Sequence, residues 1–393
     1  MITDDQPAWV AKKGITKMLV TDNTPTGRIR DTLAHSLTLP KEAAHAMPAE
    51  YYTSPEMLDV EIDQVLRREW MCVGHVGEVR KPGDFYTTEL VDEQLIVTRD
   101  MDGIVRVLSN VCRHRGNQVA EGAGNTRKFV CRYHTWSYDT TGALVAAPLM
   151  KGQTGFAKEK CSLPEFASEI WNGWIFVNLD GNADPLATRL AGLSDIVKNY
   201  HPDDRFLVFM EEDVWDCNWK CLFENFMEGY HLSATHLDTL HPMTPTKLCK
   251  KMMSGEGWTG YHAYYDPSYP PRGPFHPDLT EDECNNSPMY GIYPNLVVGM
   301  ATNFTLFMCL QPMGVDKVKI RWGVTGLEDA PDSQKVRDYV QLCRDFNIED
   351  KEKLETLQKA LKTRHYQPGP LAPDDFEGTI WDFTQYMARI IGR

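Results

Sequence analysis

The stretch VCRHRGNQVAEGAGNTRKFVCRYHTW, residues 111–136, decides the fold of this chain. Cys112 and His114 lie near its beginning, and Cys131 and His134 lie near its end. The short spacing within each pair lets both side chains of one loop reach one point, so that two such loops supply four ligands. We therefore expect the two pairs to lie at the tips of two hairpins and to hold a metal centre in a small β domain.

Three interpretations of these four residues differ in their chemistry. Two thiolates and two imidazoles bind zinc tetrahedrally, or they bind a Rieske [2Fe–2S] cluster with the cysteines on one iron and the histidines on the other. The third interpretation is a metal-free core of buried cysteines and hydrogen-bonded histidines. Each loop here carries one cysteine and one histidine, whereas zinc fingers place both cysteines together. This alternation favours the cluster, because two histidines on one iron have to come from opposed loops.

Composition and charge narrow the class of function. The 393 residues are 42% hydrophobic and 24% charged, which is ordinary for a globular protein of two or three domains. The net charge of −14 argues against a nucleic-acid or anionic-membrane surface. No stretch reaches the roughly 18 apolar residues of a membrane span, and the first residues lack the pattern of a signal peptide. We therefore expect the ten cysteines to be reduced or metal-bound in a cytoplasmic protein.

Hydrophobic spacing and turn signals divide the chain into an N-terminal arm over 1–45, a β domain over 46–181 and a larger domain over 182–393. Asp102-Gly103 between two apolar runs predicts a hairpin in the β domain. The expected helices cover residues 60–70, 186–200, 219–236, 332–346, 350–361 and 375–391, and the expected strands include 174–178, 296–311 and 318–325. The predicted fold class is α+β, in which a small all-β domain precedes an antiparallel sheet flanked by helices.

A second set of ligand-type residues follows in the larger domain. His231 and His236 are five residues apart, which is about 140° of rotation on a regular helix, so both reach one metal only if the helix ends or bends between them. Two neutral imidazoles and one carboxylate form the facial triad of non-haem Fe(II) oxygenases. Asp350 is our candidate for the carboxylate, and helical geometry alone does not separate it from Glu349 or Asp382.

The two motifs, in this order, resemble the α subunit of Rieske-type non-haem iron oxygenases, which hydroxylate aromatic rings or oxidise quaternary ammonium compounds. The resemblance extends from about residue 51 to the C-terminus. The matching residues are Cys112, His114, Cys131 and His134 for the cluster and Glu228, His231 and His236 for the mononuclear iron. It implies a sandwich-like Rieske domain over 46–181, a catalytic iron domain over 182–393, and Asp350 as the third iron ligand.

The resemblance also implies partners. A separate NAD(P)H-dependent reductase or ferredoxin would supply the electrons, since this chain has no Gly-rich dinucleotide motif. Subunits of the family associate head to tail, usually as homotrimers, so that the cluster of one subunit lies near the mononuclear iron of its neighbour. Glu228 occupies the position of the carboxylate that links a cluster histidine to an iron-bound histidine across that interface.

The implied function is that of a terminal oxygenase that uses O₂ to hydroxylate or oxidatively demethylate a small organic substrate. Ring dioxygenases of the family commonly have Asp at position 228, and Glu228 resembles the branch that oxidises N-methyl and quaternary ammonium compounds. An aromatic-ring or aromatic-acid hydroxylating mono- or dioxygenase is the alternative. A stand-alone electron carrier and a zinc-stabilised binding module are further alternatives, and the intact second motif argues against the carrier.

The region after the second motif is expected to line the substrate pocket, and most of its candidate residues are aromatic. They would stabilise a cation by about 0.5–2 kcal/mol each, stack on an aromatic ring, or pack a core. The expected residues are Trp258, Tyr261, Tyr264, Tyr265, Met289, Tyr290 and Tyr293. Arg272 and His262 are weaker candidates for binding a substrate carboxylate.

Overall fold

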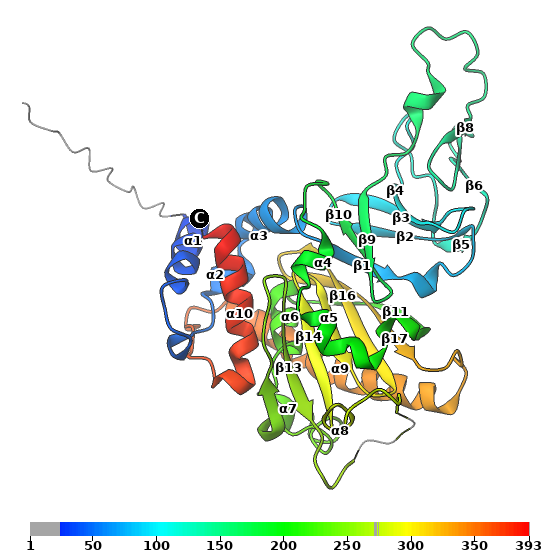
Figure 1. The fold of residues 1–393 in the computed structure, drawn as a ribbon. Helices are drawn as coiled ribbons and strands as arrows, with labels where there is room; N and C mark the ends of the chain where they lie inside the picture. Colours follow the sequence, from blue (N-terminus) through cyan, green and yellow to red (C-terminus); the bar gives the residue numbers. More distant parts are fainter. Residues whose placement is uncertain (1–23, 271–272, 274, 393) are drawn as a thin grey trace, which may run out of the picture.

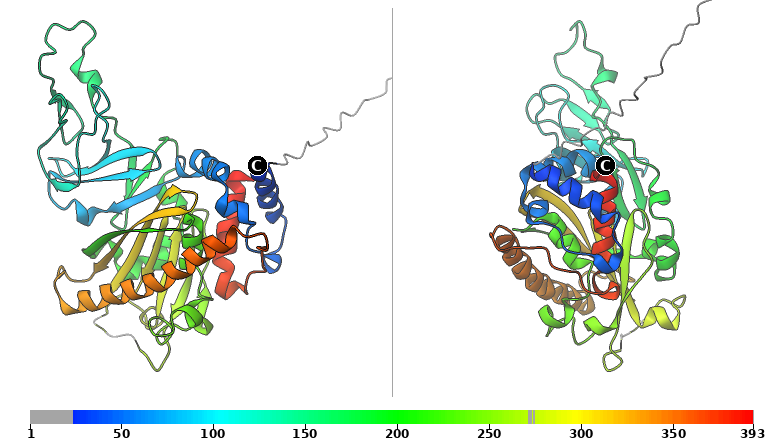
Figure 2. Two further views of the ribbon diagram at one scale, coloured as in Figure 1. Left: turned by 180° about the vertical axis from the view of Figure 1, so that it is seen from behind. Right: turned by 90° about the vertical axis from the view of Figure 1, so that its left-hand side faces the viewer.

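A computed structural model describes residues 24–270, 273 and 275–392 of the chain (Figure 1). A small β unit projects from one corner of a larger part, in which helices pack around a long antiparallel sheet. Helices α1 (Pro25–Ser36) and α10 (Asp374–Ile391) lie side by side at the opposite end of the molecule (Figure 2). The predicted α+β class is confirmed.

The N-terminal helices pack against the larger part. Ser54 begins α3 by accepting a hydrogen bond from the N–H of Met57 (3.2 Å), and Pro55 occupies the first helical position, which suits its fixed φ. The buried Lys220 Nζ lies 2.5 Å from Glu61 Oε1, which joins α3 to α6. These N-terminal elements are α1, η1 (Lys41–Ala43), α2 (Ala49–Thr53), α3 (Pro55–Glu61) and the π turn η2 (Ile62–Leu66), so the helix predicted over 60–70 ends at Leu66.

The β unit contains two antiparallel sheets with the strand orders β4–β3–β2–β5 and β6–β7–β8. The predicted Asp102-Gly103 hairpin joins β3 to β4, and Gly103 has φ +87°, which residues with a Cβ avoid. Ile96, Leu108 and Tyr138 form part of the core of this unit. Its strands are β2 (Asp84–Leu90), β3 (Glu93–Arg99), β4 (Val105–Ser109), β5 (Ala123–Asn125), β6 (Lys128–Val130), β7 (Ser137–Asp139) and β8 (Leu144–Ala146), with the short helices η3 (Val76–Glu78) and η4 (Lys158–Cys161).

A three-stranded sheet joins the β unit to the larger part. Its order is β1–β10–β9, with β1 spanning Met71–His75, β9 Ala167–Trp171 and β10 Trp174–Asn178. The side chain of Asn295 accepts from the N–H of Cys72 (2.7 Å) and donates to its carbonyl oxygen (2.8 Å). These two bonds satisfy the buried backbone of β1, so the two parts share a packed junction rather than a bare linker.

The large sheet has seven antiparallel strands in the order β11–β17–β16–β15–β14–β13–β12. In β16, Leu306 and Met308 pack into a core with α6, α9 and α10, whereas Phe307 and Cys309 pack into a second core on the other face. Because side chains alternate across a strand and both faces are buried, the sequence of this region is almost continuously apolar. The strands are β11 (Phe206–Trp215), β12 (Cys249–Lys251), β13 (Trp258–Tyr264), β14 (Asn286–Ile292), β15 (Leu296–Met300), β16 (Phe304–Gly314) and β17 (Lys317–Gly326).

One predicted pair of helices is wrong, since residues 334–361 form the single helix α9 (Gln334–Leu361) instead of two. Its buried positions continue at three- and four-residue intervals through Phe346, Asp350 and Leu354, so a single stripe faces the core. The break predicted over 347–349 is therefore absent, and the stripe passes across it from Phe346 to Asp350.

Two other predicted helices are shorter than expected. The segment 186–200 is interrupted at Gly192, whose φ of +85° stops the helix, and the segment 219–236 is interrupted by the turn over 227–230. The remaining helices are α4 (Leu186–Arg189), α5 (Leu193–Val197), η5 (Lys198–Tyr200), η6 (Pro202–Asp204), α6 (Trp219–Phe226), α7 (Leu232–Thr235), η7 (Thr246–Leu248) and α8 (Glu281–Cys284). In the described part of the chain, none of the helices has both the length and the apolar character that crossing a membrane requires.

Candidate metal centres and substrate cavity

Two matched loops at the tip of the β unit carry the residues that the sequence predicts for the cluster. The N–H of Gly116 donates to the carbonyl of Cys112, and the N–H of Thr135 donates to the carbonyl of Cys131, each at 2.9 Å. Gly116 and Thr135 both have left-handed backbones, with φ of +76° and +61°. The loops therefore turn in the same way and present their side chains from opposite sides, as two hairpin tips should.

The two histidines of these loops meet at the surface. The Nδ1 atoms of His114 and His134 are 3.1 Å apart, and both side chains are partly exposed. The ring of Trp136 stacks on His114 at 4.8 Å, and Tyr133 covers His134 at 3.8 Å between ring centres. Two ring nitrogens on opposed loops at this separation fit two imidazole ligands of one iron.

The two cysteines are buried beneath the histidines and have unequal surroundings. The hydroxyl of Tyr138 lies 3.3 Å from Cys112 Sγ and accepts from the N–H of Arg113 (3.0 Å), which leaves its own proton for the sulfur. Burial raises the pKa of the Cys112 thiol. Burial also opposes ionisation of Cys131, but backbone N–H groups of its loop outweigh it and lower the pKa of that thiol. The donor set therefore fits a cluster with two thiolate ligands inside and two imidazoles outside. The role of Tyr138 was not predicted, because nothing in its local sequence distinguishes it from a core aromatic residue.

His231 and His236 flank a helix of only four residues. α7 lies between them, with His231 before its first residue and His236 after its last. Their Nε2 atoms are 3.1 Å apart. The prediction that the helix ends between the two histidines is confirmed, since α7 ends at Thr235 and His236 has a non-helical backbone. This end brings together two side chains that a regular helix would separate.

Asp350 completes this group from the middle of α9. Its Oδ1 lies 3.2 Å from His236 Nε2 and 3.5 Å from His231 Nε2, and the carboxylate is buried. Ligands about 2.1 Å from an ion and at right angles to one another are about 3 Å apart. The three atoms therefore fit one face of a metal ion.

The other two carboxylates that the sequence left open lie elsewhere. Glu349 Oε2 is 2.7 Å from His236 Nδ1 and also accepts from the hydroxyl of Thr239 (2.7 Å), so it holds the ring of His236 from behind. Asp382 pairs with Lys251 Nζ at 2.5 Å. The sequence did not identify the supporting role of Glu349, and its adjacency to Asp350 on one helix was the only available signal.

The hydrogen bonds of the two histidines support a cation between them. Glu228 Oε1 lies 2.5 Å from Nδ1 of His231, just as Glu349 lies against Nδ1 of His236. Since each Nδ1–H donates to a carboxylate, each Nε2 presents a lone pair, and two lone pairs at 3.1 Å repel each other unless a cation lies between them. Burial disfavours protonated His231, but Glu228 and Asp350 outweigh burial and raise the pKa of this imidazole. The residues thus fit a divalent iron with further positions open.

Glu228 is fixed in the turn that follows α6. Its Oε2 accepts from the N–H of Tyr230 and from the N–H of His231 (3.1 Å). The carboxylate is buried, while Tyr230 beside it is exposed. Glu228 therefore lies behind His231, between the metal group and the molecular surface.

A cavity of about 230 Å³ opens onto His231, His236 and Asp350. Apolar and aromatic side chains dominate its lining, and its polar groups include a hydrogen-bonded pair, Tyr265 Oη and Ser287 Oγ, at 2.6 Å. Among the described lining residues there is no lysine or arginine. The remaining lining residues are Phe226, Leu232, Leu240, Met243, Thr244, Tyr261, Ala263, Met289, Gly299, Ala301, Leu306, Tyr339, Leu342 and Phe346.

The prediction of the pocket lining is correct for Tyr261, Tyr265 and Met289 and wrong for Trp258, Tyr264, Tyr290 and Tyr293. Strand alternation explains most of the difference: Trp258 and Tyr290 face the core on the opposite side of the sheet, and Tyr264 donates to Asp282. Tyr293 stacks on Tyr386 of α10 at 4.3 Å. His262 bonds with Asn286 outside the cavity, and Arg272 lies outside the described residues.

Family models match both parts of the chain. The Rieske [2Fe–2S] domain matches residues 69–166, and the catalytic domain of the ring hydroxylating alpha subunit matches residues 197–393. The chain belongs to the Rieske ring-hydroxylating oxygenase family. It is an oxidoreductase that incorporates oxygen from O₂, and its cofactors are a Rieske [2Fe–2S] cluster and a mononuclear iron.

Individual relatives of this Rieske oxygenase include both chemical branches of the family. The carnitine monooxygenase oxygenase subunit of Acinetobacter baumannii is 24% identical over 343 residues, covering 83% of this chain and 88% of the relative. The benzene 1,2-dioxygenase subunit alpha of Pseudomonas putida is 32% identical over 219 residues, covering 54% and 49%. A crystal structure of the quaternary ammonium Rieske monooxygenase CntA superposes with a TM-score of 0.80 at 23% identity, covering 90% of this chain and 98% of that one, which shows a shared fold.

Proposed function

We propose that this oxygenase oxidises a small N-methyl or quaternary ammonium compound. The observation that carries the proposal is the cavity beside His231, His236 and Asp350, whose walls include the rings of Phe226, Tyr261, Tyr265, Tyr339 and Phe346 and no described cationic side chain. Aromatic faces attract a quaternary ammonium group, by about 0.5–2 kcal/mol for each well-placed ring. The similarity to carnitine monooxygenase along most of the chain and the glutamate at position 228 support the same branch.

We assign the metal ligands as follows. The cluster is held by Cys112, His114, Cys131 and His134, and the iron is held by His231, His236 and Asp350. When bound, the iron supplies the site at which O₂ is activated with electrons from the cluster. His231, His236 and Asp350 would hold the ion from one side, and the cavity lies on the side where other ligands would bind.

Other side chains prepare the site for this chemistry. Glu228 and Glu349 hold His231 and His236 in the tautomer that exposes Nε2 to the metal. The apolar walls exclude water from the reacting methyl group. The hydroxyls of Tyr265 and Ser287 orient a polar part of the substrate by hydrogen bonding. Without a described lysine or arginine, the lining offers a substrate carboxylate only hydroxyl donors, so we expect a substrate whose polar group is neutral or cationic.

Electrons come from a separate NAD(P)H-dependent reductase or ferredoxin, and the oxygenase works as a head-to-tail homotrimer. His114 and His134 are accessible at the tip of the β unit, and exposed Arg113, Arg115 and Arg132 surround them. This position suits electron transfer to the surface turn around Glu228 on a neighbouring copy, with Glu228 as the link to the iron-bound histidine.

We propose the domain division 46–181 and 182–393, with the segment before residue 46 as an arm.

We also propose a cytoplasmic location. None of the ten cysteines forms a disulfide. The eight that have no proposed ligand role are buried or partly buried thiols, although the sulfurs of Cys72 and Cys309 lie 3.4 Å apart. Free thiols in such proximity are characteristic of a reducing compartment.

Hydroxylation of an aromatic ring is the second candidate function. It is favoured by the predominantly apolar lining, which also suits an uncharged ring stacked among the same aromatic side chains. The 32% identity to a benzene dioxygenase subunit over about half of the chain supports it.

A single-turnover experiment distinguishes the two candidates. The purified holoenzyme is reduced chemically, mixed with O₂ and pooled N-methyl amines, quaternary ammonium compounds and aromatic compounds, and the products are identified by mass spectrometry with a formaldehyde assay. Hydroxylation of an N-methyl group, with one oxygen atom in the product and the other in water, is expected to release formaldehyde and the demethylated amine. A phenol or cis-diol without demethylation would contradict the ammonium proposal, and the His231→Ala variant is the control for oxidation unrelated to the site.

A further inference from the structure

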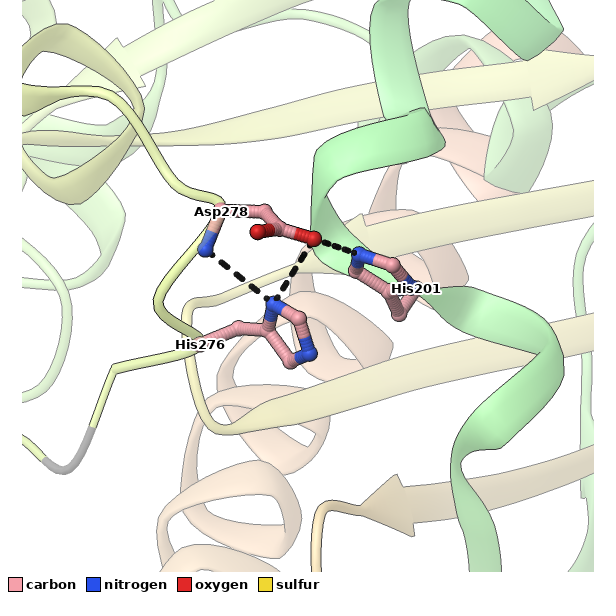
Figure 3. Close-up of side chains that lie close together, drawn as sticks. All are labelled: His201, His276 and Asp278. Carbon is pink, nitrogen blue, oxygen red and sulfur yellow. Dashed lines mark hydrogen bonds and ion pairs between the residues drawn. The ribbon is translucent and has the colours of Figure 1, made fainter.

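A third group of metal-ligating side chains lies outside both metal centres. His201, His276 and Asp278 point toward one another (Figure 3), and their ligand atoms all lie within 4.8 Å of one another. Asp278 Oδ2 is 2.7 Å from His201 Nε2 and 3.8 Å from His276 Nδ1. We propose that these residues form a separate binding site for a divalent transition-metal ion such as Zn²⁺.

His201 is held in place by the main chain and by a second carboxylate. It lies between η5 and η6 in a left-handed conformation, with φ +45° and ψ +58°, which is uncommon for a residue with a side chain. Its second ring nitrogen, Nδ1, lies 3.4 Å from Asp204 Oδ2. A carboxylate behind the non-ligating nitrogen is typical of metal-bound histidines, because it fixes the tautomer and the ring orientation.

His276 and Asp278 present two acceptors to each other. The N–H of Asp278 donates to His276 Nδ1 at 3.3 Å, so this nitrogen carries a lone pair. The same nitrogen faces the carboxylate oxygen of Asp278, which also only accepts. A cation between the two atoms would bind both, with the single lone pair of Nδ1 exchanging the long 3.3 Å bond from the Asp278 N–H for the ion. Ligand atoms around a zinc ion are about 3–3.4 Å apart. The observed 2.7 and 3.8 Å need changes of less than about 1 Å, which side-chain rotation supplies.

The site is open to ions from solution. The side chains of His201, His276 and Asp278 are 32%, 26% and 58% exposed, which leaves room for water to complete the coordination. Two imidazoles and one carboxylate suit zinc and similar borderline ions rather than magnesium or calcium, which prefer oxygen ligands. None of the three residues lines the cavity beside His231, so this ion is distinct from the catalytic iron.

An ion at this position fixes a loop that borders the substrate cavity. His276 and Asp278 belong to the loop between β13 and α8, and Tyr265 and Ser287 on either side of this region line the cavity. Without metal, Asp278 Oδ2 already bonds with His201 Nε2 at 2.7 Å, and Tyr200 donates to the carbonyl of Glu283 in α8 at 3.1 Å. The ion would add His276 to this contact, so that two residues of the loop instead of one are held to the turn at His201.

The test measures zinc bound to tag-free protein whose two iron sites are loaded. Equilibrium dialysis against Zn²⁺ followed by mass-spectrometric metal analysis is expected to give one additional zinc per chain with unchanged iron. His276→Gln and His201→Asn are expected to lose this zinc, and asparagine is chosen at 201 because it tolerates the left-handed backbone. His365→Gln, which changes an exposed histidine outside the group, should keep it.

The cluster spectrum and iron content of each variant verify that it is folded. Absence of extra zinc in the parent protein, or equal zinc in the parent and the two variants, would overturn the site. Zinc should also slow chymotrypsin cleavage after Phe275 in the parent but not in His276→Gln. Cleavage at the same rate with and without zinc would overturn the anchoring of the loop.

Discussion

The two metal centres of this oxygenase collect their ligands over very different distances along the chain. The cluster residues all lie within 112–134, on two loops closed by the same backbone hydrogen bond, and their histidines are partly exposed. The iron group combines residues 231 and 236 with Asp350 from the middle of α9, and it is mostly buried. We call the cluster residues the local site and the group of His231, His236 and Asp350 the distributed site. The local site depends on the closure of two loops, whereas the distributed site depends on how the long helix α9 packs on the sheet.

The largest expected effects follow from removing one ligand at each site. His231→Ala should abolish turnover and the binding of mononuclear iron while the cluster spectrum persists, because the cluster loops make no use of α7. Cys131→Ala should abolish the cluster and turnover while the mononuclear iron remains. Iron analysis with absorption and electron paramagnetic resonance spectra measures both outcomes. Loss of both metals in either variant would show that the two sites are not independent.

Glu228→Gln tests whether the sites are connected through this residue. Gln keeps the size of the side chain and removes its charge, so both metals should stay bound. Single-turnover oxidation should slow by about 10- to 100-fold, the usual effect of losing a carboxylate behind a metal-bound histidine. Rapid-quench kinetics of the pre-reduced enzyme gives the rate, and an unchanged rate would remove the linking role.

Glu349→Gln tests the support of the distributed site alone. It weakens the hydrogen bond that holds His236, and the expected result is iron binding about 10-fold weaker at the mononuclear site with an unchanged cluster. Competition with an iron chelator measures the affinity. Glu352→Gln, at an exposed position on the same helix, is the matched control and should bind iron as the parent does.

Tyr138→Phe gives the smallest expected effect and tests the local site. Removing the hydroxyl takes a hydrogen bond from Cys112 Sγ, which should lower the reduction potential of an intact cluster. The N–H of Arg113 also loses its acceptor, so the free energy of unfolding should fall by about 1 kcal/mol. Spectroelectrochemical titration measures the potential, and a potential equal to that of the parent would show that this hydroxyl does not interact with the ligand sulfur.

Features that depend on residues close together in the sequence were predictable, whereas features that depend on packing between distant segments were not. The β3–β4 hairpin and strand β10 follow from turn residues and short apolar runs, which act over a few residues. The end of the helix between His231 and His236 follows from their five-residue spacing, because both side chains have to reach one metal ion. The continuity of α9 was not predicted, because residues 347–349 between the two expected helices lie off the buried stripe, and only the tertiary structure shows that the stripes of 336–346 and 350–361 face the same core.

The sequence by itself determined the two ligand motifs, the α+β class and the membership of an oxygenase family, because residues close along the chain converge through short loops whose geometry is nearly fixed. Only the tertiary structure decided that Asp350 rather than Glu349 or Asp382 faces the two histidines, and that Tyr261 and Tyr265 face the cavity while Trp258 and Tyr290 do not. Neighbouring residues on a helix or strand point in different directions. Which of them reaches a distant partner depends on the rotation of α9 and the register of β13 and β14, and these are set by packing across the whole sheet.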